Sequence, residues 1–116
     1  MKVEYRKRKH TAFVYVVCSG SDTGTFEEAF REARSQGYYD TGYHYYIDPL
    51  GEVVEDRDVD AIADSNFEEY THSIYILCEA EKKINDCQRW SLEELLPILC
   101  NRYEQKLEVI FKCHTQ

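Results

Sequence analysis

The chain has 116 residues, with 22 acidic side chains, 14 basic ones and a formal net charge of −8. Apolar residues make up 43% of it, against five Gly and two Pro, which excludes disordered and collagen-like chains and suits one domain with one core. The longest apolar run, Ala12–Cys18, has seven residues, far fewer than the roughly 20 of a membrane-spanning helix. We therefore expect one globular domain that does not span a membrane.

The cysteines and the N-terminus bear on the compartment. Five cysteines form an odd set without a Cys-x-x-Cys pair, which is typical of reduced thiols, and no apolar stretch of secretory type follows the basic N-terminus. We therefore expect a cytoplasmic protein in which all five are reduced: Cys18, Cys78, Cys87, Cys100 and Cys113.

Charge is distributed unevenly along the chain. Residues 1–10 carry five basic and one acidic side chain, a net +4, so residues 11–116 carry −12. We expect a basic N-terminal arm, 1–10, ahead of a domain that spans 11–116. Because phosphate binding needs clustered Lys and Arg, nucleic acid is not an expected partner.

Nine carboxylates gather between residues 48 and 69, where Arg57 is the only basic side chain. This acidic segment is either a solvated loop region or a recognition surface for a protein partner with a basic surface. Its members are Asp48, Glu52, Glu55, Asp56, Asp58, Asp60, Asp64, Glu68 and Glu69.

In chain order, the first predicted elements are a strand and a helix. The apolar run Ala12–Cys18 is rich in β-branched and aromatic residues, which predicts a strand buried on both faces at the centre of a sheet. Thr25 and Glu28 have the spacing of a capping box, which predicts a helix that starts there. Gly37 is expected to end that helix.

A hairpin and a further strand come next. Two short strand-like runs, Tyr43–Ile47 and Glu52–Glu55, flank the turn sequence Asp48–Gly51. A polar, irregular stretch then leads to the strand-like run Ser73–Cys78.

The last predicted elements are a second helix and a closing strand. Ser91 and Glu94 form another capping-box pattern, while Pro97 predicts a kink or a late helix start. Leu107–Cys113 alternates apolar and mostly polar residues, as a strand does. The order predicts an α/β fold: a single domain with a central mixed β-sheet and flanking helices.

Three stretches carry a family resemblance: Gly42–Ile47, then Gly51–Glu55 with Arg57, then Ser73–Ile76. Together they resemble the zinc-dependent N-acetylmuramoyl-L-alanine amidase family, which includes bacteriophage lysozyme-type amidases and peptidoglycan-recognition proteins. The resemblance runs from about Phe13 to His114 and implies an amidase-like fold.

The resemblance also implies a metal site. In that family two His and one Cys or Asp hold a zinc ion that polarises the amide between muramic acid and L-alanine and activates a water molecule, assisted by a Tyr and a Lys. The first His falls on Val17, and the second matches His114. The third ligand and the Lys would lie beyond Gln116, the last residue of the sequence. We therefore predict that no metal or other cofactor binds.

Other family positions are partly retained. Tyr43 matches the assisting Tyr, and His44 is kept from the hairpin signature, whereas a further family His aligns with Ser65. A catalytic zinc needs three protein ligands that leave a fourth position open. We therefore predict that the chain is not an enzyme and that Tyr43, His44 and His114 are remnants of a catalytic set.

A binding role follows from these expectations. Tyr is enriched at interface hot spots, so Tyr38, Tyr39 and Tyr45 are expected to form a protein-binding patch beside the acidic segment. We predict a catalytically inactive amidase-like inhibitor or regulator, encoded by a phage or mobile element and directed at a host enzyme or defence protein. The alternatives are a divergent amidase that cleaves peptidoglycan, and a non-hydrolytic module that binds a peptidoglycan fragment.

Overall fold

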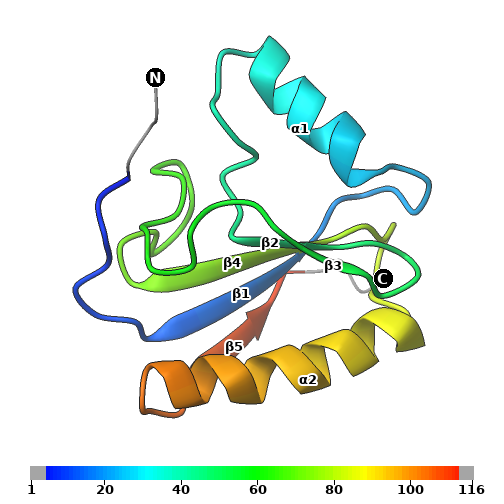
Figure 1. The fold of residues 1–116 in the computed structure, drawn as a ribbon. Coiled ribbons are helices and arrows are strands. Elements are labelled where there is room, and N and C mark those ends of the chain that lie inside the picture. The colour runs from blue at the N-terminus through cyan, green and yellow to red at the C-terminus, as the bar shows by residue number, and fades with distance from the viewer. Residues whose placement is uncertain (1–4, 113–116) are drawn as a thin grey trace.

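Five strands form one mixed sheet in the order β3-β2-β4-β1-β5 (Figure 1). The computed structural model describes residues 5–112. The two helices flank the sheet, which confirms the predicted α/β domain. The elements are β1 (Phe13–Cys18), α1 (Phe26–Ser35), β2 (Tyr45–Ile47), β3 (Val53–Glu55), β4 (Ser73–Cys78), α2 (Asp86–Arg102) and β5 (Glu108–Phe111).

The middle of the sheet is β4 rather than β1. All six residues of β4 are buried, and the strand pairs in parallel with both β1 and β2. β1 has β5 as its other parallel neighbour, and β3 runs antiparallel to β2. The expected central position of the first strand is therefore wrong, because the hairpin adds to the far side of β4.

The two faces of the sheet have different covers. Along β1 and β4, Val14, Val16 and Ile76 point to the face that packs against Leu92 and Leu99 of α2. On the opposite face, Tyr15 and Tyr75 stack with their rings 4.8 Å apart and form a second, aromatic cluster. The alternation of side chains along a strand explains this division.

The first helix forms where its capping box predicts. The Thr25 side chain accepts a hydrogen bond from the Glu28 backbone N–H at 3.2 Å, and no residue of α1 is fully buried. Phe26 contacts the sheet, with its ring 5.6 Å from that of Tyr46. In Figure 1, α1 stands beside the sheet, whereas α2 runs along the length of the other face.

The second helix begins earlier than its predicted start. Asn85 is the N-cap: its side chain accepts from the Gln88 N–H at 2.8 Å, and the Gln88 side chain accepts from the Asn85 N–H at 3.0 Å. The predicted capping box at Ser91 is therefore wrong. The Ser91 hydroxyl instead donates to the Gly51 carbonyl and so ties the helix to the hairpin turn.

The closing strand and the thiols complete the comparison with the sequence. β5 is shorter than predicted, and Cys113 lies outside the described residues. Cys78, Cys87 and Cys100 are free, but Cys18 is disulfide-bonded, so the expectation of reduced thiols is wrong at that position. Between residues 5 and 112, no helix has the length and apolar character needed to cross a membrane.

Candidate functional site

A groove of about 360 Å³ lies between α1 and the loop Asp64–Phe67. Its floor is formed by Tyr43 and Leu77, on the sheet face opposite α2. We call it the α1 groove. Its lining residues are Ala29, Glu32, Ala33, Gln36, Tyr38, Thr41, Tyr43, Asp64, Asn66, Phe67 and Leu77.

Tyr43 is a half-buried phenol at this groove. Its ring packs 4.8 Å from that of Phe67 and 6.2 Å from that of Tyr75. Its hydroxyl makes no hydrogen bond to the described part of the chain. Burial raises the pKa of Tyr43, and the neighbouring Asp64 carboxylate raises it further. The phenol therefore stays protonated near neutral pH and can donate a hydrogen bond into the groove.

Gly42 packs closely against the loop that carries Asp64. It has a φ of +87°, in the left-handed region that favours glycine, and a Cβ there would lie 2.9 Å from the Asp64 Cβ. The backbone of the loop is turned by Asp64 itself, whose Oδ1 accepts from the Asn66 N–H at 2.8 Å. The close approach places the Asp64 carboxyl beside Tyr43.

A second pocket, of about 330 Å³, adjoins the first through Tyr38, Asp64 and Asn66. It is also lined by Arg57, whose guanidinium donates to both oxygens of Asp40 at 2.8 and 3.2 Å. Both partners of this ion pair are less than a tenth exposed. The charge of Arg57 is therefore balanced inside the protein.

His44, the other retained hairpin residue, is fully buried and faces no groove. Its Nδ1 accepts from the Tyr75 N–H at 3.0 Å, so Nε2 carries the proton and donates to the Ala61 carbonyl at 2.8 Å. Burial lowers the pKa of His44 to about 4. The neutral ring thus braces the chain around Ala61 against β4.

Three members of the acidic segment are engaged in internal contacts. Asp48 Oδ1 accepts from the N–H groups of Leu50 and Glu52 and so closes the hairpin turn. Asp56 Oδ2 accepts from the backbone N–H and the hydroxyl of Thr41. Hydrogen bonds from Arg102 lower the pKa of Asp60 to about 2.

The other members of the acidic segment are exposed or pair with a basic side chain, apart from Asp64. Glu68 pairs with Lys112 at 3.3 Å and Glu69 with His72 at 3.6 Å, whereas Glu52, Glu55 and Asp58 are exposed. Asp64 alone among the nine lines the α1 groove. Several of the nine carboxylates therefore have local partners, and a recognition role for the acidic segment stays a prediction.

The three tyrosines of the predicted protein-binding patch differ in exposure. Tyr38 and Tyr39 are 48% and 45% exposed; Tyr38 lines both adjoining pockets, and Tyr39 lines the second one. Tyr45 is only 5% exposed and belongs to the core on the α2 face. Tyr45 is therefore not available for the contact expected of it.

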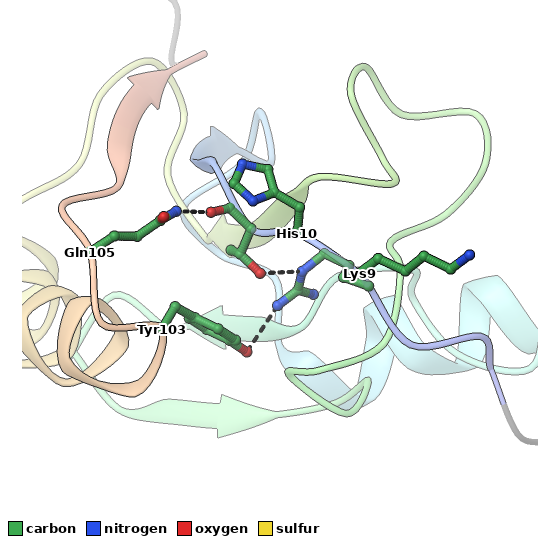
Figure 2. A pocket seen from close by; sticks show the side chains of 6 residues that line it. Lys9, His10, Tyr103 and Gln105 are labelled. Atoms are coloured by element: carbon green, nitrogen blue, oxygen red, sulfur yellow. Dashed lines mark hydrogen bonds between the residues drawn. The ribbon is translucent and has the colours of Figure 1, made fainter.

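Another pocket, of about 190 Å³, lies between residues 8–11 and the turn after α2 (Figure 2). Arg8 reaches across it, donating to the Tyr103 hydroxyl at 2.9 Å and to Thr11 Oγ1 at 3.0 Å. The Gln105 side chain donates to the Thr11 carbonyl. Because Arg8 also donates to the Ala61 carbonyl, its guanidinium is committed to holding the chain together.

The described residues do not fit a zinc ion. Between residues 5 and 112, no group of three or more His, Cys, Asp or Glu side chains is arranged to hold a metal. Val17 is half-buried in the aromatic cluster, and His114 lies outside the described residues.

Known proteins resemble this chain in sequence. An endolysin of Klebsiella phage KP32 is 38% identical over 65 residues, which cover 53% of this chain and 42% of that endolysin. The match thus spans less than half of that relative. An endolysin of Escherichia phage T7 is 28% identical over 115 residues, which cover 89% of this chain and 76% of the relative. No family model matches the chain.

Solved structures match the fold. The N-acetylmuramoyl-L-alanine amidase LysC from Clostridium intestinale has a TM-score of 0.76 at 19% identity, covering 94% of this chain and 78% of the amidase. PGRP-Hd from Alvinella pompejana has a TM-score of 0.79 at 15% identity. The match covers 97% of this chain and 81% of PGRP-Hd. The chain therefore has the fold shared by amidases and peptidoglycan-recognition proteins, and the resemblance seen in its sequence is confirmed.

The expectation that the chain is not an enzyme is contradicted by these findings. Both curated relatives are endolysins, and the solved neighbours include amidases. Two replaced positions, Val17 and Ser65, and the family residues expected beyond Gln116 had led to that expectation. Sequence reasoning also missed Gly42, Asn66 and Phe67 as parts of the site, although a glycine directly before the matched Tyr43 was a visible signal.

Proposed function

We propose that this chain binds muramoyl peptides of peptidoglycan in the α1 groove and hydrolyses the amide between N-acetylmuramic acid and L-alanine. The observation that carries the proposal is Tyr43. The resemblance gives this residue an assisting role, and its hydroxyl stands unpaired at the groove that the fold leaves open. The endolysin relatives and the amidase neighbour support the same activity.

The groove offers contacts of the kind that such a ligand needs. Aromatic rings at Tyr38, Tyr43 and Phe67 provide apolar faces, while Asn66 and Gln36 provide amide groups that both donate and accept hydrogen bonds. A protonated Tyr43 hydroxyl can donate to the oxygen of the scissile amide, where negative charge develops during hydrolysis. These contacts bind and orient the substrate.

The test measures cleavage and binding separately. Purified cell-wall sacculi are incubated with the protein, with and without added zinc, and newly freed L-alanine amino termini are quantified by mass spectrometry. Calorimetry with a soluble muramoyl tripeptide measures binding. We expect Tyr43→Phe to lower peptide release by tenfold or more, because it removes only the hydroxyl.

Trp90→Ala is the matched control, because Trp90 is 65% exposed on α2 and lines neither pocket of the site. It should leave both release and binding unchanged. Absence of both release and binding in the unaltered protein would overturn the proposal.

The cytoplasmic location and a basic protein partner stay predictions. Cell fractionation tests the first and affinity capture tests the second.

A further inference from the structure

Asp64 has one carboxylate oxygen that the protein does not use. Oδ1 accepts from the Asn66 N–H, whereas Oδ2 has no hydrogen-bond or ion-pair partner in the described part of the chain. The residue is half-buried and lines both adjoining pockets of the site. The Asp64 side chain packs closely against Gly42. Asp64 therefore lines the groove with a half-buried carboxyl group that keeps one oxygen unpaired in the described part of the chain.

Asp64 has no ion-pair partner among the described residues. Among the described residues that line the α1 groove, Glu32 and Asp64 are acidic and none is Lys, Arg or His. Arg57 lines the adjoining pocket with Asp64 and interacts with it electrostatically, but both oxygens of Asp40 engage its guanidinium. The groove therefore presents a negative potential, which favours a ligand with a positive charge.

The aromatic residues that line the α1 groove indicate which kind of cation it would bind. Phe67 and Tyr43 lie in ring contact beside Asp64, and Tyr38 lines the same groove with its ring half exposed. A carboxylate set among aromatic faces suits an organic ammonium group, because the rings attract the cation and cover the carbon chain that carries it. Glu32 is less available, because its Oε1 accepts from the Gln36 side chain at 2.7 Å.

We propose that Asp64 binds a free side-chain ammonium on the peptide of the ligand. The preferred ligands would then be muramoyl peptides whose diamino acid has not been cross-linked, since cross-linking turns that amine into a neutral amide. This inference rests on the proposed function, because it names the class of muramoyl peptide that the same groove selects.

Two ligands that differ in one charge test the inference directly. Calorimetry at low salt compares N-acetylmuramoyl-L-alanyl-D-isoglutaminyl-L-lysine with the same peptide acetylated on the lysine amine, and mass spectrometry checks that both stay intact. We expect the free amine to bind about tenfold more tightly, as hydrogen bonds to charged groups in partly desolvated sites do. The preference should shrink as salt is raised.

The variants assign the effect to its residue. Asp64→Asn keeps the shape of the side chain, so it should weaken binding of the free amine about tenfold and leave the acetylated peptide unaffected. Glu94→Gln removes one charge from the exposed surface of α2 and should preserve the preference. Circular dichroism confirms that each variant is folded.

The outcomes separate the two proposals. Equal binding of both peptides by the unaltered protein would overturn the role of Asp64 and leave the proposed function standing. A preference that survives in Asp64→Asn would also overturn it. Binding of neither peptide would overturn both proposals. The comparison of the two ligands on the unaltered protein does not depend on whether any variant folds.

Discussion

The two helices make opposite uses of the sheet. α2 sets Leu92 and Leu99, which are 2% and 1% exposed, against the strands and closes that face. α1 buries no residue completely and contacts the sheet near its N-terminal end through Phe26. One helix therefore supplies the core, while the other is the wall of a binding groove.

This difference explains how a small domain keeps a groove open. Interiors are close-packed, so a face that is filled by a helix leaves no space for a ligand. Ala33 of α1 and Gln36, the C-cap residue of that helix, instead line the groove opposite the loop that carries Asp64. Stability and recognition are thus assigned to different faces of the same five strands.

The strongest test of this division compares an apolar residue of each helix. Leu99→Ala removes a side chain from the filled face, so we expect the free energy of unfolding to fall by about 2–5 kcal/mol. Phe30→Ala on α1 removes a half-buried ring, so it should cost roughly 1 kcal/mol. Urea denaturation measures both. Equal losses would show that α1 contributes to the core as α2 does.

A second test measures how stability depends on pH. It concerns His44, whose hydrogen bonds hold the chain around Ala61 against β4. The folded pKa of His44 is about 4, below the unfolded value of about 6.5, so the unfolded chain takes up a proton more readily between these values. Stability therefore falls as the pH is lowered through that window, by about 3 kcal/mol.

Denaturation series at several pH values check this expectation. His44→Gln should be less stable at pH 7 and should show a flatter profile between pH 6.5 and 4. Asp60, whose pKa is about 2, loses its contribution only at lower pH, below about 3.8, and so does not obscure the window. An unchanged profile in His44→Gln would assign the acid sensitivity to another group.

The sequence predicted those elements whose signals are local. The Thr25–Glu28 capping box, the Asp48–Gly51 turn and the run Ser73–Cys78 each specify their own backbone, and each is found where predicted. The start of α2 was missed because Asn85 and Gln88 compete with a second, equally valid capping pattern further along.

The groove could not be predicted in the same way, because it depends on contacts between distant residues. Asp64 appeared in the sequence only as one of nine carboxylates, and nothing local shows that it lies against Gly42. Tyr45 was predicted to be exposed because tyrosines were counted as a cluster. The fold instead assigns Tyr45 and Tyr46 to opposite faces of β2, with both side chains buried.

A third test separates the cost of backbone strain from an effect on ligand binding. It compares two glycines that have similar φ angles. Gly42 and Gly20 have φ angles of +87° and +93°, but a Cβ at Gly20 would meet nothing within 4 Å. Alanine at either position should cost about 1–2 kcal/mol through the left-handed backbone. Gly42→Ala should in addition displace Asp64 and weaken binding of the muramoyl peptide, which calorimetry detects. Equal affinities in the two variants would show that Gly42 does not position Asp64.

The smallest expected effect belongs to the exposed carboxylates outside the groove. Glu52, Glu55 and Asp58 are exposed and line neither pocket of the site, so changing all three to their amides should alter the free energy of unfolding by less than about 0.5 kcal/mol. Affinity for the muramoyl peptide should also be unchanged, in contrast to Asp64→Asn. A basic protein partner should associate more slowly with this variant at low salt. The three removed charges attract such a partner over long distances in the unaltered protein. Loss of peptide binding in the triple variant would instead show that the acidic segment acts as one surface, and the separation between groove and periphery would fail.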